Sequence, residues 1–292
     1  MKRLFVVLSF FMAPLLFSAC QKHEEESDWK KTEIKSLKLA PGELKVMSFN
    51  IRQHTTEKNA FNHWSLRAPA CVQMVWDQQP TLLGLQEMTE TQWMYMFGLL
   101  ESNGYAGIAT QDIRNSFLYK QDVLEVVSHG LFWLSDTPEV SSLCWDGYER
   151  TARWAVMRII ATGQQFFYVN THSALTVTAR GSCINLIKKR IKMYNAENLP
   201  VVMVGDFNAV TEESSFDSIR QALLNTRDIA PITDYLDTYN GWDLPTNTPY
   251  VCDHIWISNE GIACSEYKTV TKAYDGHKLI SDHYPVYSML QF

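Results

Sequence analysis

The stretch VVMVGDFNAV, residues 201–210, runs through four apolar residues and then turns to Gly205-Asp206-Phe207-Asn208. An apolar run bounded by turn-forming residues is typical of a buried strand. Because side chains alternate between the two faces of a strand, Asp206 and Asn208 are expected to point the same way. The alternative is an ordinary turn, which Gly, Asp and Asn favour for local backbone reasons. This stretch alone does not decide between the two interpretations.

Other segments have the same strand-like character, being rich in Val, Ile, Phe, Tyr and Trp. With Pro200–Gly205, the predicted strands are Leu44–Ile51, Thr81–Gln86, Val123–Leu134, Arg153–Ala161, Gln165–Asn170, Cys252–Ser258 and Pro285–Leu290. Helical patterns predict helices at Ser65–Gln79, Glu90–Ser102, Arg180–Asn195 and Ser214–Asn225. The three strands between residues 123 and 170 follow one another without a helix, which favours antiparallel pairing. The mixture predicts a layered α/β sandwich.

Polar side chains stand at the ends of these strands, at what would be one rim of the sheets. They are Asn50, Glu87, Asn170, His172, Asp206, Asn208, Asp253, Asp282 and His283. Taken singly, each has a plain structural explanation, such as a core histidine for His172 or a helix cap for Glu87. One turn explains one polar strand end and not six, so we expect the set to converge on a functional site. Its oxygen and nitrogen donors suit Mg²⁺ or Mn²⁺ better than zinc.

The order of these motifs resembles the endonuclease/exonuclease/phosphatase family, which includes deoxyribonuclease I, exonuclease III, neutral sphingomyelinases and inositol polyphosphate 5-phosphatases. The motifs are FNIR (Asn50), LQE (Glu87), NTH (His172), GDFN (Asp206, Asn208), CDHI (Asp253) and SDH (Asp282, His283). The resemblance runs from about Leu44 to Phe292 and implies a four-layer α/β/β/α sandwich of two packed mixed or antiparallel sheets. The stretches NHWSLR (62–67), FWLSDTPEV (132–140) and TYNGW (238–242) further resemble a bacterial, often exported, branch.

The resemblance also implies a role for each motif residue. Glu87 would be the principal ligand of Mg²⁺ or Mn²⁺, with Asn50 beside it and Asp282 as a further ligand. Asp206 would orient and deprotonate the attacking water. His283, oriented by Asp253, would bond the phosphate or receive a proton, and His172 would be a second catalytic or phosphate-binding group. Substrate binding would fall to Asn208, Asn50 and Arg52.

Two departures from the family pattern stand out. Deoxyribonuclease-like members carry a glutamate that partners the NTH histidine, but residues 111–119 contain no Glu, and Asp112 is the nearest substitute. The run YVCDHIW (250–256) resembles the WCDRI signature of inositol 5-phosphatases, yet His254 stands where their Arg is expected. His172 is therefore expected to lack its usual partner, and an inositol 5-phosphatase is not favoured.

On these grounds the expected function is metal-dependent hydrolysis of a phosphate ester, foremost by a phosphodiesterase that uses water attack on a metal-bound phosphate. The alternatives are an inositol-phosphate or sugar-phosphate monoesterase, a secreted nuclease, and a non-catalytic surface-binding lipoprotein. The chain has a net charge of −6, whereas proteins that rely on direct phosphate contacts are normally basic. Nucleic acid is therefore a less favoured partner, and we expect a monomer.

The N-terminus carries features of export. Residues 1–19 have a basic start and an apolar run typical of a signal peptide. Cys20 resembles the acylated cysteine of a bacterial lipoprotein, and the polar residues 20–40 a tether, leaving 41–292 as the catalytic domain. We expect a lipoprotein of the bacterial cell envelope, facing the periplasm or the surface and held to the membrane through Cys20; the alternative is an ordinary cleaved signal.

Five further cysteines leave disulfide pairing open: Cys71, Cys144, Cys183, Cys252 and Cys264. None is spaced like a zinc site.

Overall fold

The computed structural model describes residues 37–55, 57–242 and 250–292 of the chain. The expected signal peptide, Cys20 and most of the expected tether lie outside the described residues. Among the helices described, none combines the length and the apolar character needed to cross a membrane.

The described strands form two six-stranded sheets. The first has the order β11-β12-β1-β2-β4-β3, with β11 Ala263–Thr269, β12 Val286–Gln291, β1 Glu43–Asn50, β2 Leu82–Gln86, β4 Phe117–Lys120 and β3 Tyr105–Ile108. The second has the order β5-β6-β7-β8-β10-β9, with β5 Leu124–Trp133, β6 Thr151–Ile159, β7 Gln165–His172, β8 Val201–Asp206, β10 Asp253–Ser258 and β9 Leu223–Asn225. Both sheets are mixed, because β1 pairs with β2 and β7 pairs with β8 in parallel while their other neighbours are antiparallel.

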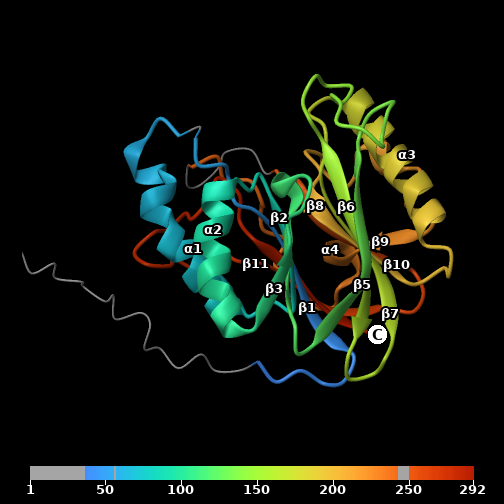
Figure 1. Cartoon of the computed structure of the whole chain (residues 1–292), viewed down its shortest axis with the longest axis horizontal. Helices are drawn as coiled ribbons and strands as arrows, with labels where there is room; N and C mark the ends of the chain where they lie inside the picture. The colour runs from blue at the N-terminus through green and yellow to red at the C-terminus, as the bar shows by residue number, and fades with distance from the viewer. Residues whose placement is uncertain (1–36, 56, 243–249) are drawn as a thin grey trace, which may run out of the picture. The chain divides into compact units, whose positions relative to one another are not determined.

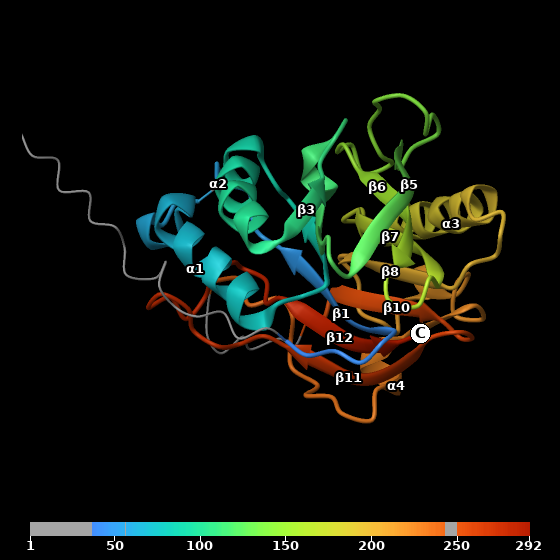
Figure 2. The ribbon, with the colours of Figure 1, turned by 60° about the horizontal axis from the view of Figure 1, so that its bottom comes forward.

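Helices cover the outer faces of the two sheets. The connection between parallel strands β1 and β2 contains α1 (Trp64–Gln78), and that between β7 and β8 contains α3 (Val177–Tyr194). Helices α1 and α2 (Glu90–Leu100) lie on the side of the first sheet, and α3 lies on the side of the second (Figures 1 and 2). An apolar cluster packs between the sheets and includes Val46, Phe117, Tyr168 and Val204. The predicted four-layer α/β/β/α sandwich is confirmed.

All eight predicted strands are present to within two residues at each end, and β5, β6 and β7 pair antiparallel as expected. Short strands β3, β4 and β9 and the alternating strand β11 were not predicted. The helix expected at Ser214–Asn225 is wrong. That segment holds one 3-10 turn, Ser214–Phe216, and then strand β9, which pairs with the open edge of β10.

The remaining short elements of the described residues are helix α4 (Thr226–Ile229) and three 3-10 turns, η2 (Ala60–Asn62), η3 (Glu101–Asn103) and η4 (Ile113–Asn115). The turn at Ser214–Phe216 is η5. All five cysteines after Cys20 are free thiols. The Sγ atoms of Cys144 and Cys183 lie 3.5 Å apart and are both buried.

Candidate active site

The second sheet places three functional groups side by side through its strand register. His172 at the end of β7 is paired with Asp206 at the end of β8, and Asp206 is paired with Asp253 at the start of β10. Asp206 and Asp253 are buried. Strand pairing alone therefore brings together residues that lie up to 81 positions apart in the sequence (253 − 172).

Asp206 and Asn208 also lie together, but not for the reason that the alternation of a strand suggested. Strand β8 ends at Asp206, and Asn208 has left-handed backbone geometry with φ 52°. The backbone N–H of Asn208 donates to Asp206 Oδ1 at 2.9 Å, and its side-chain Nδ2 donates to the Ser173 carbonyl at 3.1 Å. A side-chain turn, which Asp and Asn favour, fixes the pair.

The first sheet supplies Asn50 and Glu87 from neighbouring strand ends. Asn50 is paired with Gln86 across β1 and β2, and Glu87 follows at once with φ 58°. Arg52 has the same left-handed φ of 58°. Such geometry costs a non-glycine residue about 1–2 kcal/mol and collects at functional sites. It turns Glu87 and Arg52 out of the strand direction at the sheet rim.

A polar bridge joins the two sheets beneath the site. Gln86 Nε2 donates to Asn170 Oδ1 at 2.7 Å, and Asn170 Nδ2 donates to the Leu85 and Ser116 carbonyls. Both side chains are fully buried. Asn170, one of the polar strand ends expected at the functional site, is therefore a structural residue that holds the two sheets in register.

Asp282 and His283 come from the loop before β12, which is pinned from several sides. Ser281 Oγ donates to the Asn50 carbonyl at 2.7 Å, and the Asn240 N–H donates to the Asp282 carbonyl at 2.8 Å. The buried Arg67 guanidinium donates to the carbonyls of Ile51, Arg52 and Ile280. Arg67, a residue of α1, thus joins the segment after β1 to the segment before Asp282. The NHWSLR and TYNGW stretches meet here, because the Arg67 guanidinium lies 5.6 Å from the Trp242 ring centre.

Asp206 is the centre of the resulting hydrogen-bond network. Its Oδ2 accepts from Asn50 Nδ2 at 2.9 Å and lies 3.4 Å from His172 Nε2 and 3.7 Å from His283 Nε2. The same Asn50 amide nitrogen donates to Glu87 Oε1 at 3.2 Å. Asn50 Oδ1 accepts from the Arg52 N–H at 3.0 Å, so its amino group, rather than its carbonyl oxygen, faces the two carboxylates.

The two histidines beside Asp206 have opposite electrostatics. Burial would lower the pKa of His283, but the carboxylates of Asp253, at 2.9 Å from Nδ1, and Asp206 outweigh burial and hold that pKa well above its usual range. Burial lowers the pKa of His172 to about 3, since the pull of Asp206 is opposed by the cations of Arg150 and nearby groups. At neutral pH, His283 is therefore protonated and His172 is neutral.

Asp112 does not partner His172. Its Oδ1 accepts from Arg114 Nε at 2.8 Å, and its Oδ2 accepts from Thr151 Oγ1 at 2.7 Å. The described residues give His172 no other carboxylate contact than Asp206. The substitute that the sequence offered at this position therefore serves a different part of the site.

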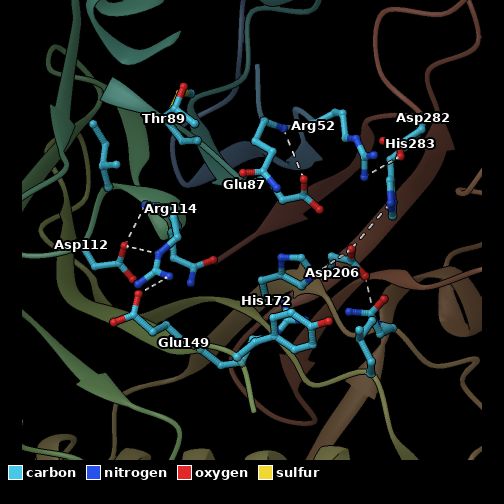
Figure 3. Close-up of a pocket in the computed structure, with 18 of the residues that line it drawn as sticks. Arg52, Glu87, Thr89, Asp112, Arg114, Glu149, His172, Asp206, Asp282 and His283 are labelled. Atoms are coloured by element: carbon cyan, nitrogen blue, oxygen red, sulfur yellow. Dashed lines mark hydrogen bonds and ion pairs between the residues drawn. The ribbon is translucent and has the colours of Figure 1, made fainter. Parts of the chain in front are cut away.

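These groups line one cleft of about 900 Å³ (Figure 3). Its catalytic end, as we define it, consists of Arg52, Glu87, His172, Asp206, Asn208, Asp282 and His283. Asn50 and Asp253 lie beneath this surface, buried, and act through their neighbours. On the other side of the cleft lie Asp112, Arg114, Tyr148, Glu149 and Arg150, which we call the far wall.

The catalytic end fits a hard divalent metal ion. Glu87 faces the cleft with no ion pair to any described residue, since its oxygens accept only from Asn50 and the Gln53 N–H. Asp282 lies on the same cleft, 3.3 Å from the Arg52 guanidinium, and burial raises its pKa against the pull of His283 and Arg52. Carboxylate oxygens of this kind suit Mg²⁺ or Mn²⁺.

A second cluster, Asp206, Cys252 and His283, has three possible ligand atoms within 4.8 Å of one another. Burial, reinforced by Asp253 and Asp206, raises the pKa of the Cys252 thiol well above its usual range, so it stays protonated. His283 carries a proton as well. His283 Nδ1 lies 2.9 Å from Asp253 Oδ2 and 3.8 Å from Cys252 Sγ, so the cluster is already joined by hydrogen bonds.

Sequence reasoning missed several residues of the cleft. The Tyr239 ring stands edge-on to His283 with 5.0 Å between ring centres, and Tyr250 Oη donates to the Asn208 carbonyl at 2.6 Å. Tyr239 belongs to TYNGW (238–242), whose sequence gives no sign that the ring lies beside His283. Arg114, Tyr148 and Glu149 had no signal, because exposed polar loop residues look alike in one sequence.

The site combines buried carboxylates and a charged histidine with carboxylates that can bind a divalent ion, all at the rim of two packed sheets. This combination defines a metal-dependent hydrolase of phosphate esters. The chain belongs to the Endonuclease/Exonuclease/phosphatase family, to which residues 47–283 match. It is a phosphoric ester hydrolase, and members of this family generally depend on a divalent metal.

Solved structures agree with this membership. A family protein from Bacteroides thetaiotaomicron is 27% identical, with a TM-score of 0.79 over 87% of this chain and 99% of its own. A mannosyl-6-phosphatase from Bacteroides thetaiotaomicron is 27% identical, with a TM-score of 0.77 over 85% of this chain and 100% of its own. Among curated proteins, an uncharacterized protein, L388, of Acanthamoeba polyphaga mimivirus is 22% identical over 83% of this chain and 98% of its own length.

Proposed function

We propose that the chain uses Mg²⁺ or Mn²⁺ to hydrolyse the phosphate ester of a small polar alcohol, with a sugar phosphate as the first candidate. The observation that carries the proposal is the position of Asp206 between a neutral and a charged histidine on the cleft that Glu87 also lines. The mannosyl-6-phosphatase relative supports a sugar phosphate.

In this proposal Glu87 would hold the metal ion, with Asp282 on the same cleft and Asn50 bonded to Glu87 from beneath. When bound, the ion would neutralise charge on the phosphoryl oxygens. For Asn50 to offer its carbonyl oxygen, its amide has to turn over, because its amino group faces the carboxylates.

The proton chemistry falls to the second sheet. Asp206 takes a proton from the attacking water, since its Oδ2 faces the cleft and is held by Asn50. His283, kept charged by Asp253, donates a hydrogen bond to the phosphoryl group as negative charge develops there. Asn208 has one Nδ2 hydrogen left after its bond to the Ser173 carbonyl, and Arg52 adds a cation. His172, neutral, supports the phosphoryl group by hydrogen bonding.

The test is hydrolysis of p-nitrophenyl phosphate, bis-p-nitrophenyl phosphate and hexose 6-phosphates by the purified domain, with Mg²⁺, with Mn²⁺ and with EDTA. Metal-dependent release that EDTA abolishes is expected. Absence of release from every ester with either metal would overturn the proposal and leave a non-catalytic binding protein as the explanation.

Phosphodiester cleavage is the second candidate. A cleft of about 900 Å³ leaves room for an alcohol on each side of the phosphoryl group. The ratio of bis-p-nitrophenyl phosphate to p-nitrophenyl phosphate cleavage distinguishes the two candidates, since a monoesterase prefers the second compound.

We further propose that the mature chain is a cell-envelope lipoprotein anchored through Cys20. The apolar run before Cys20 and the polar residues after it support this. Labelling with a fatty-acid analogue in a bacterial host should mark the wild-type chain and not the Cys20→Ser variant, and equal labelling would contradict the proposal.

A further inference from the structure

The cleft extends well beyond the groups that handle the phosphoryl transfer. Figure 3 shows Asp112, Arg114 and Glu149 gathered on the side of the cleft away from Asp282 and His283. The far wall comes from residues 111–115, which include η4, and from the turn before β6. An alcohol attached to a phosphate at the catalytic end has this wall as a neighbour.

On the far wall, a hydrogen-bond donor and an acceptor lie exposed side by side. Arg114 Nη1 is 2.9 Å from Glu149 Oε2, and the side chains are 37% and 43% exposed. Asp112, 5% exposed, holds Arg114 Nε at 2.8 Å and is itself fixed by Thr151. Among the described residues, Arg114 Nη2 has no partner. The guanidinium is therefore held in place and still has a donor to offer.

This arrangement complements a pair of adjacent hydroxyl groups. Each hydroxyl both donates and accepts hydrogen bonds, so one can accept from Arg114 while its neighbour donates to Glu149. Hydrogen bonds to charged groups are stronger than those between neutral groups. Tyr148 precedes Glu149 and is 58% exposed, with the Arg150 guanidinium 5.5 Å from its ring centre. Its exposed aromatic surface is one against which the carbon face of a ring can pack.

The charge of the far wall argues against a second phosphate or a nucleic acid strand. Arg114 lies between two carboxylates, and Arg150 Nε lies 3.4 Å from Asp146 with 10% of its side chain exposed. Both cations are thus already neutralised, whereas a surface that follows a phosphate backbone presents unpaired ones. A neutral, hydroxyl-rich group fits this wall better than an anion.

We propose that Arg114 and Glu149 form a specificity subsite that binds adjacent hydroxyls of a polyhydroxylated alcohol whose phosphate lies at the catalytic end. This inference rests on the proposed function, because it presumes a phosphate ester in the cleft. The subsite acts on substrate choice and leaves the bond-breaking chemistry to the catalytic end.

The test compares Glu149→Gln and Arg114→Gln with a matched control. Arg158 and Glu125 form an ion pair of the same length, 2.9 Å, with side chains 39% and 53% exposed, between β5 and β6 and outside the residues that line the cleft. Arg158→Gln therefore removes a similar surface pair without touching the cleft. Substrates are glucose, mannose and galactose 6-phosphate, and cyclohexylmethyl phosphate, which has a ring of the same size and no hydroxyls.

In the wild-type protein, at least one hexose 6-phosphate should be preferred over cyclohexylmethyl phosphate. Each cleft variant should raise KM for that sugar phosphate about tenfold or more, as expected for loss of a hydrogen bond to a charged group. The same variants should leave kcat, and the KM for cyclohexylmethyl phosphate, within about twofold, and Arg158→Gln should change neither.

Two results would overturn the subsite. One is a wild-type enzyme that hydrolyses cyclohexylmethyl phosphate as well as every sugar phosphate, and the other is an equal loss on both kinds of substrate in the cleft variants. If the wild type hydrolyses no ester at all, the proposed function fails instead. In that case the affinity of the protein for the three hexose 6-phosphates is measured by calorimetry. The subsite is ruled out if Glu149→Gln binds them with the same affinity as the wild type.

Discussion

At the catalytic end of the cleft, Asp206 is 1% exposed and is held by the Asn50 amide, the Asn208 N–H and two imidazoles. At the far wall, Arg114 and Glu149 are more than a third exposed. They are held by one ion pair to each other, one to Asp112 and a hydrogen bond of 3.3 Å from Ser141 Oγ to Glu149 Oε1. The first region is built on paired strand ends of two sheets, and the second on loops between strands. Within one cleft, then, rigidity and exposure change together.

The difference separates two kinds of function. Groups that share a proton or hold a metal ion need fixed positions, which buried strand ends supply. Groups that choose an alcohol can sit on loops, where sequence changes disturb the fold least. Substitutions at the catalytic end should therefore act on kcat and on metal binding, and those at the far wall on KM for particular alcohols.

The largest expected effect is that of Asp206→Asn. Removing the proposed general base should lower kcat for bis-p-nitrophenyl phosphate about 10²- to 10⁴-fold. The loss should be equal for sugar phosphates, because the step is common to all of them. The oxygen that accepts from Asn208 is retained, so the fold should persist, which thermal unfolding checks. Activity above a tenth of the wild-type value would show that Asp206 is not the base.

The second largest effect is expected for Glu87→Gln, which should weaken the binding of the metal ion. The metal concentration that gives half-maximal activity should rise about 100-fold, because even the supporting groups of a metal site are worth about 10- to 100-fold. Glu90→Gln is the control, since Glu90 also lines the cleft but is exposed at the start of α2. Equal shifts in both variants would mean that the cleft attracts the ion only through its overall charge.

Asp253→Asn should produce a smaller loss of activity, about tenfold, together with a change in titration. Burial lowers the pKa of His283 while Asp253 and Asp206 raise it, so removing one carboxylate should lower that pKa. Imidazole resonances followed by NMR in EDTA should show His283 charged at pH 7 in the wild type and titrating at lower pH in the variant. An unchanged titration would assign the raised pKa to Asp206 alone.

The ion pair between His283 and Asp253 also makes the stability of the fold depend on pH. The pKa of His283 is higher in the folded protein than in the unfolded chain. The contribution of the charged His283 to the free energy of unfolding is therefore fully present below about pH 6.5, and it is lost as pH rises through the pKa of the folded state. The difference in unfolding free energy between the wild type and Asp253→Asn in EDTA should therefore shrink as pH rises. A difference that grows with pH would contradict this assignment.

The catalytic end could be expected from the sequence, because its residues follow apolar runs that read plainly as strands. The eight predicted strands formed, and the side chains expected to meet at their ends, from Asn50 to His283, gather at one rim, apart from Asn170. Asn170 looks the same as Asn50 in sequence. Its role as a bridge between sheets depends on Gln86 of the opposite sheet, 84 positions away.

The far wall could not be predicted for a related reason. Arg114 and Glu149 meet across 35 positions through loops whose courses no local pattern specifies. The prediction of a helix at residues 214–225 was wrong for the same reason, because strand β9 forms only by pairing with the edge of β10. Left-handed geometry at Arg52 and Glu87 was equally hidden, since neither residue favours it.

The smallest effect should come from Asp146, which supports the far wall without lining the cleft. Its carboxylate accepts from the Leu175 N–H at 3.0 Å and the Tyr148 N–H at 3.1 Å, and it pairs with Arg150. Asp146→Ala should loosen this turn and raise KM for the preferred sugar phosphate about fivefold, the value of one ordinary hydrogen bond. Values of kcat for bis-p-nitrophenyl phosphate should stay unchanged, because Asp206 and His283 are anchored elsewhere.

Asp146→Asn is the matched variant, since it keeps an oxygen for the Tyr148 N–H and loses the charge and the second oxygen, which accepts from the Leu175 N–H. KM for the sugar phosphate should rise less in Asp146→Asn than in Asp146→Ala. Hydrogen exchange of the amides between residues 144 and 150 should be faster in Asp146→Ala than in Asp146→Asn. If Asp146→Ala instead lowers kcat for every ester, the two ends of the cleft are coupled. The far wall would then help to set the catalytic geometry as well as the choice of alcohol.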